Sequence, residues 1–309
     1  MTAGTLQRGP AGGVRPFPHS NRKDDMTSIV SANGAGIPAI GLGTWQLSGD
    51  TALRCVEAAL KAGYRHIDTA AMYGNEREVG EAIRRSGVQR DDIFLTTKVW
   101  YDQLAFGALQ RSAEESLKRL KCERVDLLLI HWPSKTVSIE EQVRGLCDAR
   151  RRGLARHIGL ANFPPHLLEE AVRFADQPLV TDQVEHHPYL DQSELKSELA
   201  AHGMSLTSYS PLGKGSLLDD PTIVEIAREH GKSPAQVVLR WHVQQPMTIA
   251  IPRSSNPRRI AENIDVFDFA LSEEEMGRLF GLARPDGRML DPSFAPDWSG
   301  KSQKGRATA

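Results

Sequence analysis

The chain has 309 residues, of which 40% are hydrophobic and 25% charged, a composition typical of an ordinary folded protein rather than a disordered one. Its 38 Lys and Arg residues almost balance its 39 Asp and Glu residues, so the net charge of −1 argues against nucleic acid or an anionic membrane as a partner. The three cysteines, Cys55, Cys122 and Cys147, are widely spaced, which excludes a disulfide framework or a CxxC metal site and favours a reducing, cytoplasmic compartment.

The two ends differ in composition from the rest of the chain. Residues 1–26 are rich in glycine, proline and arginine and lack the apolar stretch of a secretory signal. Such a segment cannot bury enough apolar surface to offset its ordering entropy, so we expect a disordered tail over 1–26 and a loose tail over 301–309. A more regular pattern begins at Met26, and the sequence does not decide whether translation starts at Met1 or at Met26.

Between the tails, short apolar runs alternate with longer amphipathic ones. Asn33-Gly34 separates Ile29-Val30 from Ile37, which predicts a β-hairpin. Eight predicted strands follow, at Ile40–Thr44, His66–Thr69, Ile93–Val99, Val125–His131, His157–Asn162, Val180–Glu185, Ser205–Ser210 and Thr248–Arg253. Helical patterns lie between them at 50–62, 76–86, 105–121, 139–152, 165–175, 192–202 and 219–243, with another at 257–264.

Eight strand–helix repeats predict an α/β fold, a (β/α)8 TIM barrel that occupies residues 27–300 as a single domain. The alternative, an open doubly wound sheet, would carry a glycine-rich dinucleotide fingerprint after its first strand. Gly41-Leu42-Gly43 begins such a pattern, but Gln46 stands where the third glycine belongs. The sequence therefore favours the barrel.

Polar side chains follow the predicted strands at the barrel rim where active sites of this fold lie. Asp68, Tyr73, Lys98 and His131 are among them, and the last two follow apolar neighbours that make an unpartnered charge costly. We expect the Lys98 ammonium to lower the pKa of the Tyr73 phenol, Asp68 to keep Lys98 charged, and His131 to hydrogen-bond a carbonyl oxygen. Such a group is a general acid aimed at a developing alkoxide, and its hydride must come from a cofactor.

Motifs along the chain resemble those of the aldo-keto reductase superfamily, and most of all its bacterial branch that includes 2,5-diketo-gluconate reductases. Each motif is weak by itself, but their order is specific and spans residues from about 28 to about 290. They are Gly41–Trp45, Asp68–Glu76, Thr97–Trp100, Leu129–Pro133, Gly159–Phe163, Gln183–Glu185, Tyr209–Gly213 and Ile251–Ser254.

The resemblance implies carbonyl reduction with NADPH as the cofactor. By position it assigns the proton donor to Tyr73, the groups that tune it to Asp68 and Lys98, and substrate orientation to His131. It also implies that Asn162 and Gln183 hold the nicotinamide carboxamide and that Tyr209 stacks on the nicotinamide. The full set of implied cofactor-binding residues is Gly43, Thr44, Asp68, Asn162, Gln183, Tyr209, Ser210, Leu212, Gly213, Arg253, Ser254, Arg259, Glu262 and Asn263.

The resemblance implies that Arg253, Ser254 and Arg259 bind the 2′-phosphate of NADPH, with Glu262 and Asn263 at the adenine. The first three residues also form an anion site on physical grounds. Arg253, Ser254 and Arg259 lie beside a predicted helix start at Asn256-Pro257. The alternative is a solvated basic cap. Many relatives carry Lys where this chain has Arg253, which keeps the charge, and Ser where it has Ala161, so that one hydroxyl to the carboxamide is lost.

Three tryptophans each follow a predicted barrel strand and indicate a substrate pocket. We expect Trp45, Trp100 and Trp132 to line it together with His131. Residues 285–300 resemble the variable C-terminal lid loop of the superfamily. Glu185 and His187 share a strand face and could suggest a metal, but no third ligand with suitable spacing is evident, so a structural role is favoured and no metal is expected.

Three functions are compatible with these features. The first is a monomeric, NADPH-dependent reductase of small dicarbonyl, sugar-derived or aromatic carbonyl compounds. The second is a regulatory protein of the same superfamily that binds the cofactor with little turnover. The third is a barrel lyase or isomerase acting on a phosphorylated substrate. The presence of Asp68, Tyr73, Lys98 and His131 together favours the first.

Overall fold

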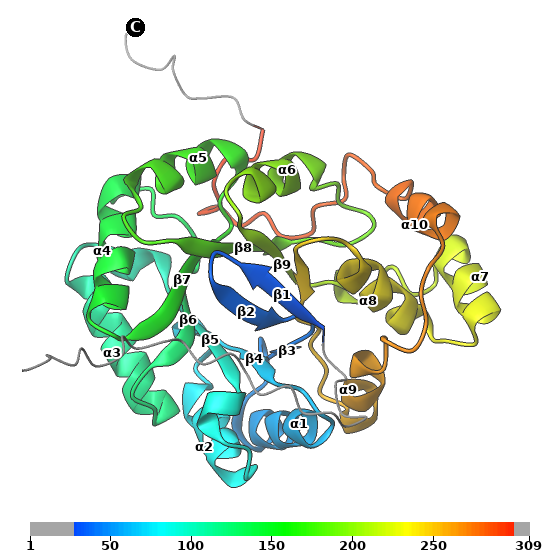
Figure 1. Ribbon diagram of the computed structural model, residues 1–309, viewed down its shortest axis with the longest axis horizontal. Coiled ribbons are helices and arrows are strands. Elements are labelled where there is room, and N and C mark those ends of the chain that lie inside the picture. The colour runs from blue at the N-terminus through cyan, green and yellow to red at the C-terminus, as the bar shows by residue number, and fades with distance from the viewer. Residues whose placement is uncertain (1–27, 300–309) are drawn as a thin grey trace, which may run out of the picture.

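Eight parallel strands form the centre of the structure, a computed structural model that describes residues 28–299 (Figure 1). They are β3 (Leu42–Gly43), β4 (His66–Asp68), β5 (Phe94–Val99), β6 (Val125–Ile130), β7 (Ala155–Ala161), β8 (Leu179–Glu185), β9 (Ser205–Tyr209) and β10 (Thr248–Ala250). Each strand pairs with the next in chain order, and a parallel bridge between Ile40 and Ala250 joins the two edges. The predicted (β/α)8 barrel is thereby confirmed, whereas the tails predicted at 1–26 and 301–309 lie outside the described residues.

Helices surround the barrel (Figure 1). They are α1 (Gly49–Lys61), α2 (Glu76–Arg85), α3 (Ala108–Leu120), α4 (Ile139–Arg151), α5 (Pro165–Phe174), α6 (Ser193–Ala201), α7 (Pro221–His230), α8 (Pro234–Gln244), α9 (Pro257–Ile264) and α10 (Glu273–Phe280), with short 3-10 turns η1 (Ala71–Tyr73), η2 (Arg90–Asp92), η3 (Tyr101–Gln103) and η4 (Gly213–Gly215). The largest buried cluster lies where their apolar faces meet the outward side chains of the strands. No helix within residues 28–299 is long and apolar enough to cross a membrane.

The predicted hairpin is present and covers the amino end of the barrel. It comprises β1 (Ile29–Ala32) and β2 (Ala35–Pro38), and both turn residues have positive φ, 44° at Asn33 and 85° at Gly34, as a tight hairpin turn requires. Asn33 Nδ2 donates to the Leu179 carbonyl at 2.7 Å, where β8 begins. Ile37 packs into the buried cluster inside the barrel. The carboxyl ends of the strands are therefore left to form the open mouth.

In the C-terminal part of the chain, one helix prediction was wrong and one helix was missed. The single helix expected over 219–243 is two helices, α7 and α8, because Gly231 adopts φ 62° and Ser233 starts α8 with a capping box to Gln236. α10 was not predicted, although Ser272 and Glu275 form the same kind of capping box at its start. α7, α8 and α10 share a second buried cluster beside the barrel.

Candidate active site

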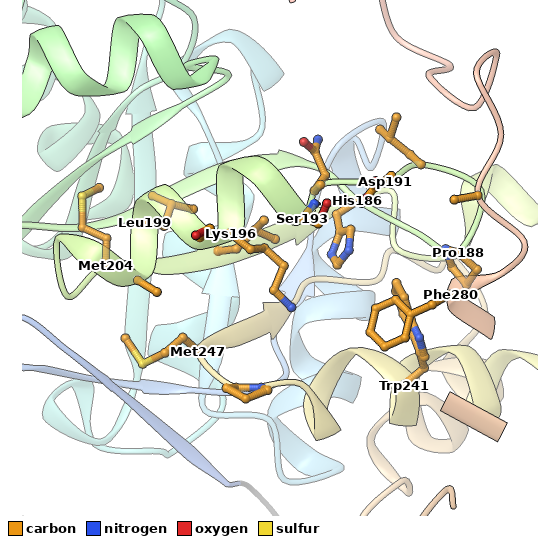
Figure 2. A pocket seen from close by; sticks show the side chains of 17 residues that line it. His186, Pro188, Asp191, Ser193, Lys196, Leu199, Met204, Trp241, Met247 and Phe280 are labelled. Atoms are coloured by element: carbon orange, nitrogen blue, oxygen red, sulfur yellow. Dashed lines mark hydrogen bonds between the residues drawn. The ribbon is translucent and has the colours of Figure 1, made fainter. Parts of the chain in front are cut away.

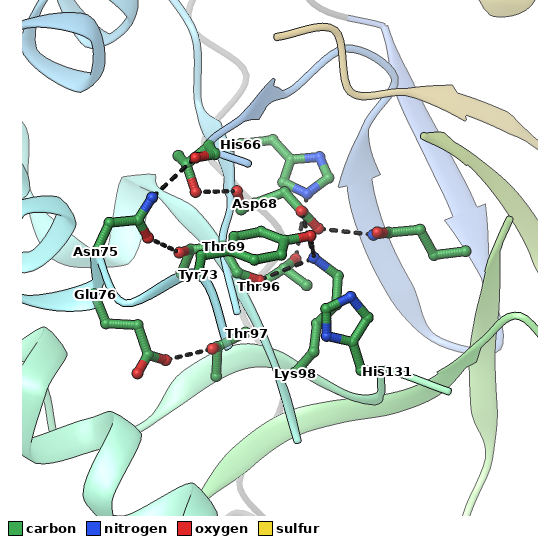
Figure 3. Close-up of polar contacts among 12 residues, drawn as sticks. His66, Asp68, Thr69, Tyr73, Asn75, Glu76, Thr96, Thr97, Lys98 and His131 are labelled. Atoms are coloured by element: carbon green, nitrogen blue, oxygen red, sulfur yellow. Dashed lines mark hydrogen bonds and ion pairs between the residues drawn. The ribbon is translucent and has the colours of Figure 1, made fainter. Parts of the chain in front are cut away.

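Four titratable side chains meet at the mouth of the barrel because they follow three adjacent strands. Asp68 ends β4, Tyr73 ends the η1 turn after it, Lys98 lies near the end of β5 and His131 directly follows β6. Since β4, β5 and β6 are neighbours in the sheet, their carboxyl ends lie side by side. Figure 3 shows Asp68, Tyr73 and His131 gathered around the Lys98 amine.

Lys98 is completely buried and is the centre of the hydrogen-bond network at the mouth. Its Nζ lies 2.6 Å from Asp68 Oδ1, 2.9 Å from the Thr69 carbonyl and 3.2 Å from Tyr73 Oη (Figure 3). One ammonium thus contacts both a carboxylate and the phenol. This arrangement fixes the phenol oxygen in space and gives it a charged hydrogen-bond partner.

Burial and charge act in opposite directions on these groups. Burial raises the pKa of Tyr73 and the Lys98 ammonium lowers it, and the net pKa lies above its ordinary value. The expectation of a net lowering was therefore wrong, because removing the phenol from water outweighs the effect of Lys98. Burial by itself lowers the pKa of Lys98, but Asp68 and Tyr73 raise it overall, so the amine stays charged. Burial, and then Lys98, hold the pKa of His131 well below its ordinary value, so its imidazole is neutral.

Asn75 joins the first loop of the barrel to the segment that carries Tyr73. Its buried Nδ2 donates to the carbonyls of Thr44 and Leu47, both at 2.8 Å, and its Oδ1 accepts from Thr69 Oγ1 at 2.8 Å. Asn75 was assigned no role from the sequence, although it lies within the Asp68–Glu76 motif. Its contacts hold the loop with Trp45 against the catalytic segment.

Aromatic side chains surround the approach to Tyr73 and His131. The ring centroid of Trp45 lies 4.9 Å from that of Tyr73, and the Trp100 ring lies 4.9 Å from the His131 ring. Trp45 is 44% exposed but Trp132 only 6%, so Trp132 contributes mainly to packing. The structure thus brings Trp45, Trp100 and His131 together around Tyr73, whereas the buried Trp132 packs against Phe294.

The C-terminal segment over 285–299 reaches this aromatic cluster through Phe294. The Phe294 ring centroid lies 5.4 Å from Trp100, 5.5 Å from Trp132 and 4.7 Å from Tyr101. Neither Phe294 nor Tyr101 was assigned a role from the sequence, and no local pattern distinguishes either of them. The position of Phe294 depends on how the segment folds back over the barrel, and Tyr101 of η3 meets it there.

Glu185 attaches this segment to the barrel. The fully buried carboxylate accepts hydrogen bonds from the main-chain N–H groups of Met289, at 2.8 Å, and Leu290, at 3.0 Å, and its Oε1 lies 3.1 Å from His187 Nε2. Glu185 therefore holds the C-terminal segment, and His187 contacts Glu185 rather than that segment. Residues 28–299 contain no cluster of three or more potential metal-binding side chains.

The amides expected to hold the nicotinamide lie beside the catalytic group. Gln183 Nε2 donates to Asp68 Oδ2 at 2.7 Å, which leaves the amide oxygen to accept from a ligand. Asn162 Nδ2 donates to the His131 carbonyl at 2.9 Å, and Tyr209 Oη donates to Asn162 Oδ1 at 2.8 Å. The structure therefore brings Asn162, Gln183 and Tyr209 to one side of the mouth.

Two further segments were expected to contact the cofactor, the turn over 210–213 and the loop start at Gly43–Thr44. Ser210 and Gly213 both have positive φ, 47° and 51°, and a hydrogen bond of 2.8 Å closes the turn that also contains Leu212. The main chain at Gly43 packs closely against the segment after β10, because a Cβ there would lie 2.8 Å from the Ile251 carbonyl. Thr44 is fully buried and its hydroxyl donates to the Asp68 carbonyl, so this hydroxyl is already used within the protein.

The residues assigned to the 2′-phosphate and adenine lie where β10 leads into α9. Arg253 is exposed and donates to the carbonyls of Trp45 and Gln46, both at 3.2 Å, across the join between the first and last strands. Ser254 Oγ accepts from the Asn256 N–H at 3.1 Å, at the start of α9. The remaining three residues of this group are an exposed Arg259, a Glu262 that pairs with Arg258 at 2.9 Å, and a buried Asn263.

Comparison with known sequences gives consistent matches. The pattern of the Aldo/keto reductase family matches residues 39–284. An aldo-keto reductase of Mycolicibacterium smegmatis is 44% identical over 265 residues, which cover 85% of this chain and 95% of the relative. An aldo-keto reductase of Mycobacterium avium is 46% identical over 268 residues, which cover 86% of this chain and 93% of the relative.

Solved structures agree with the sequence matches. A crystal structure provisionally described as 2,5-diketo-D-gluconic acid reductase B has a TM-score of 0.87 and 48% identity, covering 89% of this chain and 98% of that one. The Bombyx mori aldo-keto reductase in complex with NADP has a TM-score of 0.79 and 35% identity, covering 83% of this chain and 93% of that one.

Proposed function

Because the chain belongs to the aldo/keto reductase family, we propose that it reduces aldehydes and ketones to alcohols with NADPH, and that Tyr73 donates the proton. The observation that carries this proposal is the contact of the buried Lys98 ammonium with both Asp68 and Tyr73. A phenol held in this way donates a proton to an oxygen atom that gains negative charge beside it.

The residues at the mouth suit an NADP cofactor in the chemistry that they offer. Gln183 presents an amide oxygen beside Asp68, which suits the N–H groups of a carboxamide. Arg253 is exposed and Ser254 lies at the start of α9, which suits a phosphate. NADPH, when bound, supplies the hydride.

The protein side chains divide the remaining work. The neutral His131 imidazole hydrogen-bonds the substrate carbonyl oxygen without competing for the proton. Tyr73 transfers its proton to that oxygen, and the charged Lys98 stabilises the phenolate that remains. Asp68 keeps Lys98 charged. Trp45, Trp100 and Phe294 exclude water from the reacting carbonyl and favour substrates with a flat or apolar part.

The proposed substrates are small dicarbonyl, sugar-derived and aromatic carbonyl compounds, and we propose a cytoplasmic monomer with no nucleic-acid or membrane partner. The three cysteines form no disulfide, which suits a reducing compartment. A single elution volume that matches one chain in size-exclusion chromatography would support the monomer. A larger species would contradict it.

A substrate panel tests the proposed activity. Oxidation of NADPH is followed by absorbance with methylglyoxal, a 2,5-diketo-gluconate, an aromatic aldehyde and a simple ketone. We expect turnover of at least one, with a clear order of preference. If the protein binds NADPH but turns over none of these compounds, a regulatory protein that binds the cofactor with little turnover is the better description.

A further inference from the structure

A cavity of about 420 Å3 lies on the outside of the barrel, away from the active site. It is formed by α6, the end of α8, the segment over 186–193 and the end of α10 (Figure 2). None of Asp68, Tyr73, Lys98 or His131 is among the described residues that line it. Its volume falls within the range of small-molecule sites in proteins.

The wall of this cavity is mainly apolar. Its larger apolar side chains include Leu199, Met204, Trp241, Met247 and Phe280, and Figure 2 shows them around a common space. The Phe280 ring is 47% exposed and its centroid lies 5.1 Å from that of Trp241. An exposed aromatic ring over a buried one forms a surface on which a hydrocarbon chain or ring could stack.

One cation lies within this apolar wall. The half-buried Lys196 of α6 lines the cavity, and its Nζ donates to a neutral amide, Gln245 Oε1, at 2.5 Å. Burial lowers the pKa of Lys196 to about 8. By contrast, Lys232 pairs with Asp268 at 2.6 Å and its pKa is raised. Lys196 is therefore a desolvated cation whose described hydrogen-bond partner carries no charge.

The other titratable groups of the cavity do not neutralise Lys196. Asp191 is the one carboxylate among the described lining residues, and its Oδ1 accepts from the Ser193 N–H at 2.8 Å instead. His186 is held neutral by burial, since its pKa lies well below the ordinary value, and its Nδ1 lies 3.0 Å from Ser208 Oγ. The cavity thus combines an apolar surface with a cation that forms no ion pair with a described residue.

We propose that this cavity binds an apolar monocarboxylate, whose carboxylate pairs with Lys196 and whose hydrocarbon part packs against Trp241, Met247 and Phe280. An ammonium–carboxylate pair is strengthened in a partly desolvated site, and the ligand would supply the ion-pair partner that Lys196 lacks among the described residues. The hydrocarbon part would cover the exposed face of Phe280 and remove apolar surface from water.

Calorimetric titration of the full-length protein with octanoate tests this site. We expect saturable binding of octanoate. Octanol, which has the same chain without the charge, should bind at least roughly tenfold more weakly than octanoate. Lys196→Met should weaken octanoate roughly tenfold or more, and Lys196→Arg should retain binding. Lys232→Met is the matched control and should bind octanoate as the unaltered protein does.

Three results would overturn the proposal. They are the absence of octanoate binding, equal affinity for octanol, and undiminished octanoate binding by Lys196→Met. The last result would also place the ligand elsewhere, for example at the aromatic mouth. Carbonyl reduction by Lys196→Met should match that of the unaltered protein, because Lys196 lies outside the catalytic group, so failure of this proposal is distinguishable from failure of the proposed function.

Discussion

Asp68 and Gln183 are joined by a hydrogen bond of 2.7 Å from the amide nitrogen to Asp68 Oδ2, while Lys98 occupies Asp68 Oδ1 at 2.6 Å. A single buried carboxylate therefore connects the amide proposed to hold the nicotinamide with the amine that controls Tyr73. This connection fixes the place where the cofactor would bind relative to the proton donor. Reactant geometry of this kind is a large part of what enzymes contribute to rate.

Replacing Tyr73 with Phe should remove the proton donor and leave the rest of the site intact. We expect kcat for carbonyl reduction to fall roughly 10²- to 10⁴-fold, with nearly unchanged NADPH affinity by fluorescence titration. Tyr101→Phe is the matched control, because Tyr101 packs in the same aromatic cluster but lies outside the Lys98 network. Comparable turnover by Tyr73→Phe and the unaltered protein would show that the acid lies elsewhere.

Lys98→Met should shift the pH dependence of alcohol oxidation. Oxidation needs the phenolate, so its rate rises as pH approaches the pKa of Tyr73, which is raised by burial and partly lowered again by Lys98. Without Lys98 the pKa rises further, and the ascending limb moves to higher pH. The measurement is the pH profile of NADP⁺-dependent oxidation.

Folding must be controlled in that experiment because Lys98→Met leaves Asp68 as a buried, unbalanced charge. The double variant Lys98→Met/Asp68→Asn removes both charges and should recover thermal stability but not activity. An ascending limb at its original pH in a folded Lys98→Met protein would contradict the proposed role of Lys98.

Arg253→Ala should weaken NADPH binding more than NADH binding. A guanidinium contact to a phosphate contributes roughly 1.5–3 kcal/mol, so we expect NADPH affinity to fall roughly ten- to a hundredfold. A smaller loss common to both cofactors should follow from the two bonds that Arg253 makes to the Trp45 and Gln46 carbonyls. Arg84→Ala is the matched control, since Arg84 is likewise exposed and pairs with Glu81 on α2, outside the proposed cofactor-binding residues. Equal losses for the two cofactors would remove the 2′-phosphate assignment.

Glu185→Gln should loosen the lid. The carboxylate accepts the Met289 N–H with Oε1 and the Leu290 N–H with Oε2, and an amide can accept only one of them. We expect a loss of about 1–3 kcal/mol of stability, faster amide exchange at both N–H groups and a higher substrate KM. The exposed Glu194→Gln serves as control. Unchanged amide exchange at Met289 and Leu290 would show that other contacts hold the lid.

The sequence was sufficient to predict the barrel because its signals are local and repeated. Eight short apolar runs alternate with amphipathic ones, and Asn33-Gly34 adopts the turn that its composition favours. The prediction failed where periodicity continues across a break, as between α7 and α8. There the capping residue Ser233 carried the information that hydrophobic spacing did not.

The candidate site was predictable where a residue follows a strand and not where long-range packing decides. Lys98 and His131 could be placed because a strand end fixes their position at the rim. Phe294 could not be placed, because its position depends on hydrogen bonds that the main chain near it donates to Glu185, about a hundred residues earlier in the chain. The predicted direction of the net pKa shift of Tyr73 was also wrong, because desolvation depends on the complete surroundings of the phenol.

Two glycine-to-alanine changes should shift stability in opposite directions. A Cβ at Gly80, buried in α2, would collide with the main-chain carbonyl of Leu120 at the end of α3, whereas a Cβ at the exposed Gly277 in α10 would meet nothing within 4 Å. We expect Gly80→Ala to cost about 1–3 kcal/mol and Gly277→Ala to add about 0.5–1 kcal/mol by lowering the entropy of the unfolded chain. Thermal unfolding measures the melting temperature of each variant, and each glycine-to-alanine change serves as the control for the other. An unchanged or raised melting temperature of Gly80→Ala would mean that α2 does not pack against α3 as described, and a lowered melting temperature of Gly277→Ala would contradict the open space around that residue.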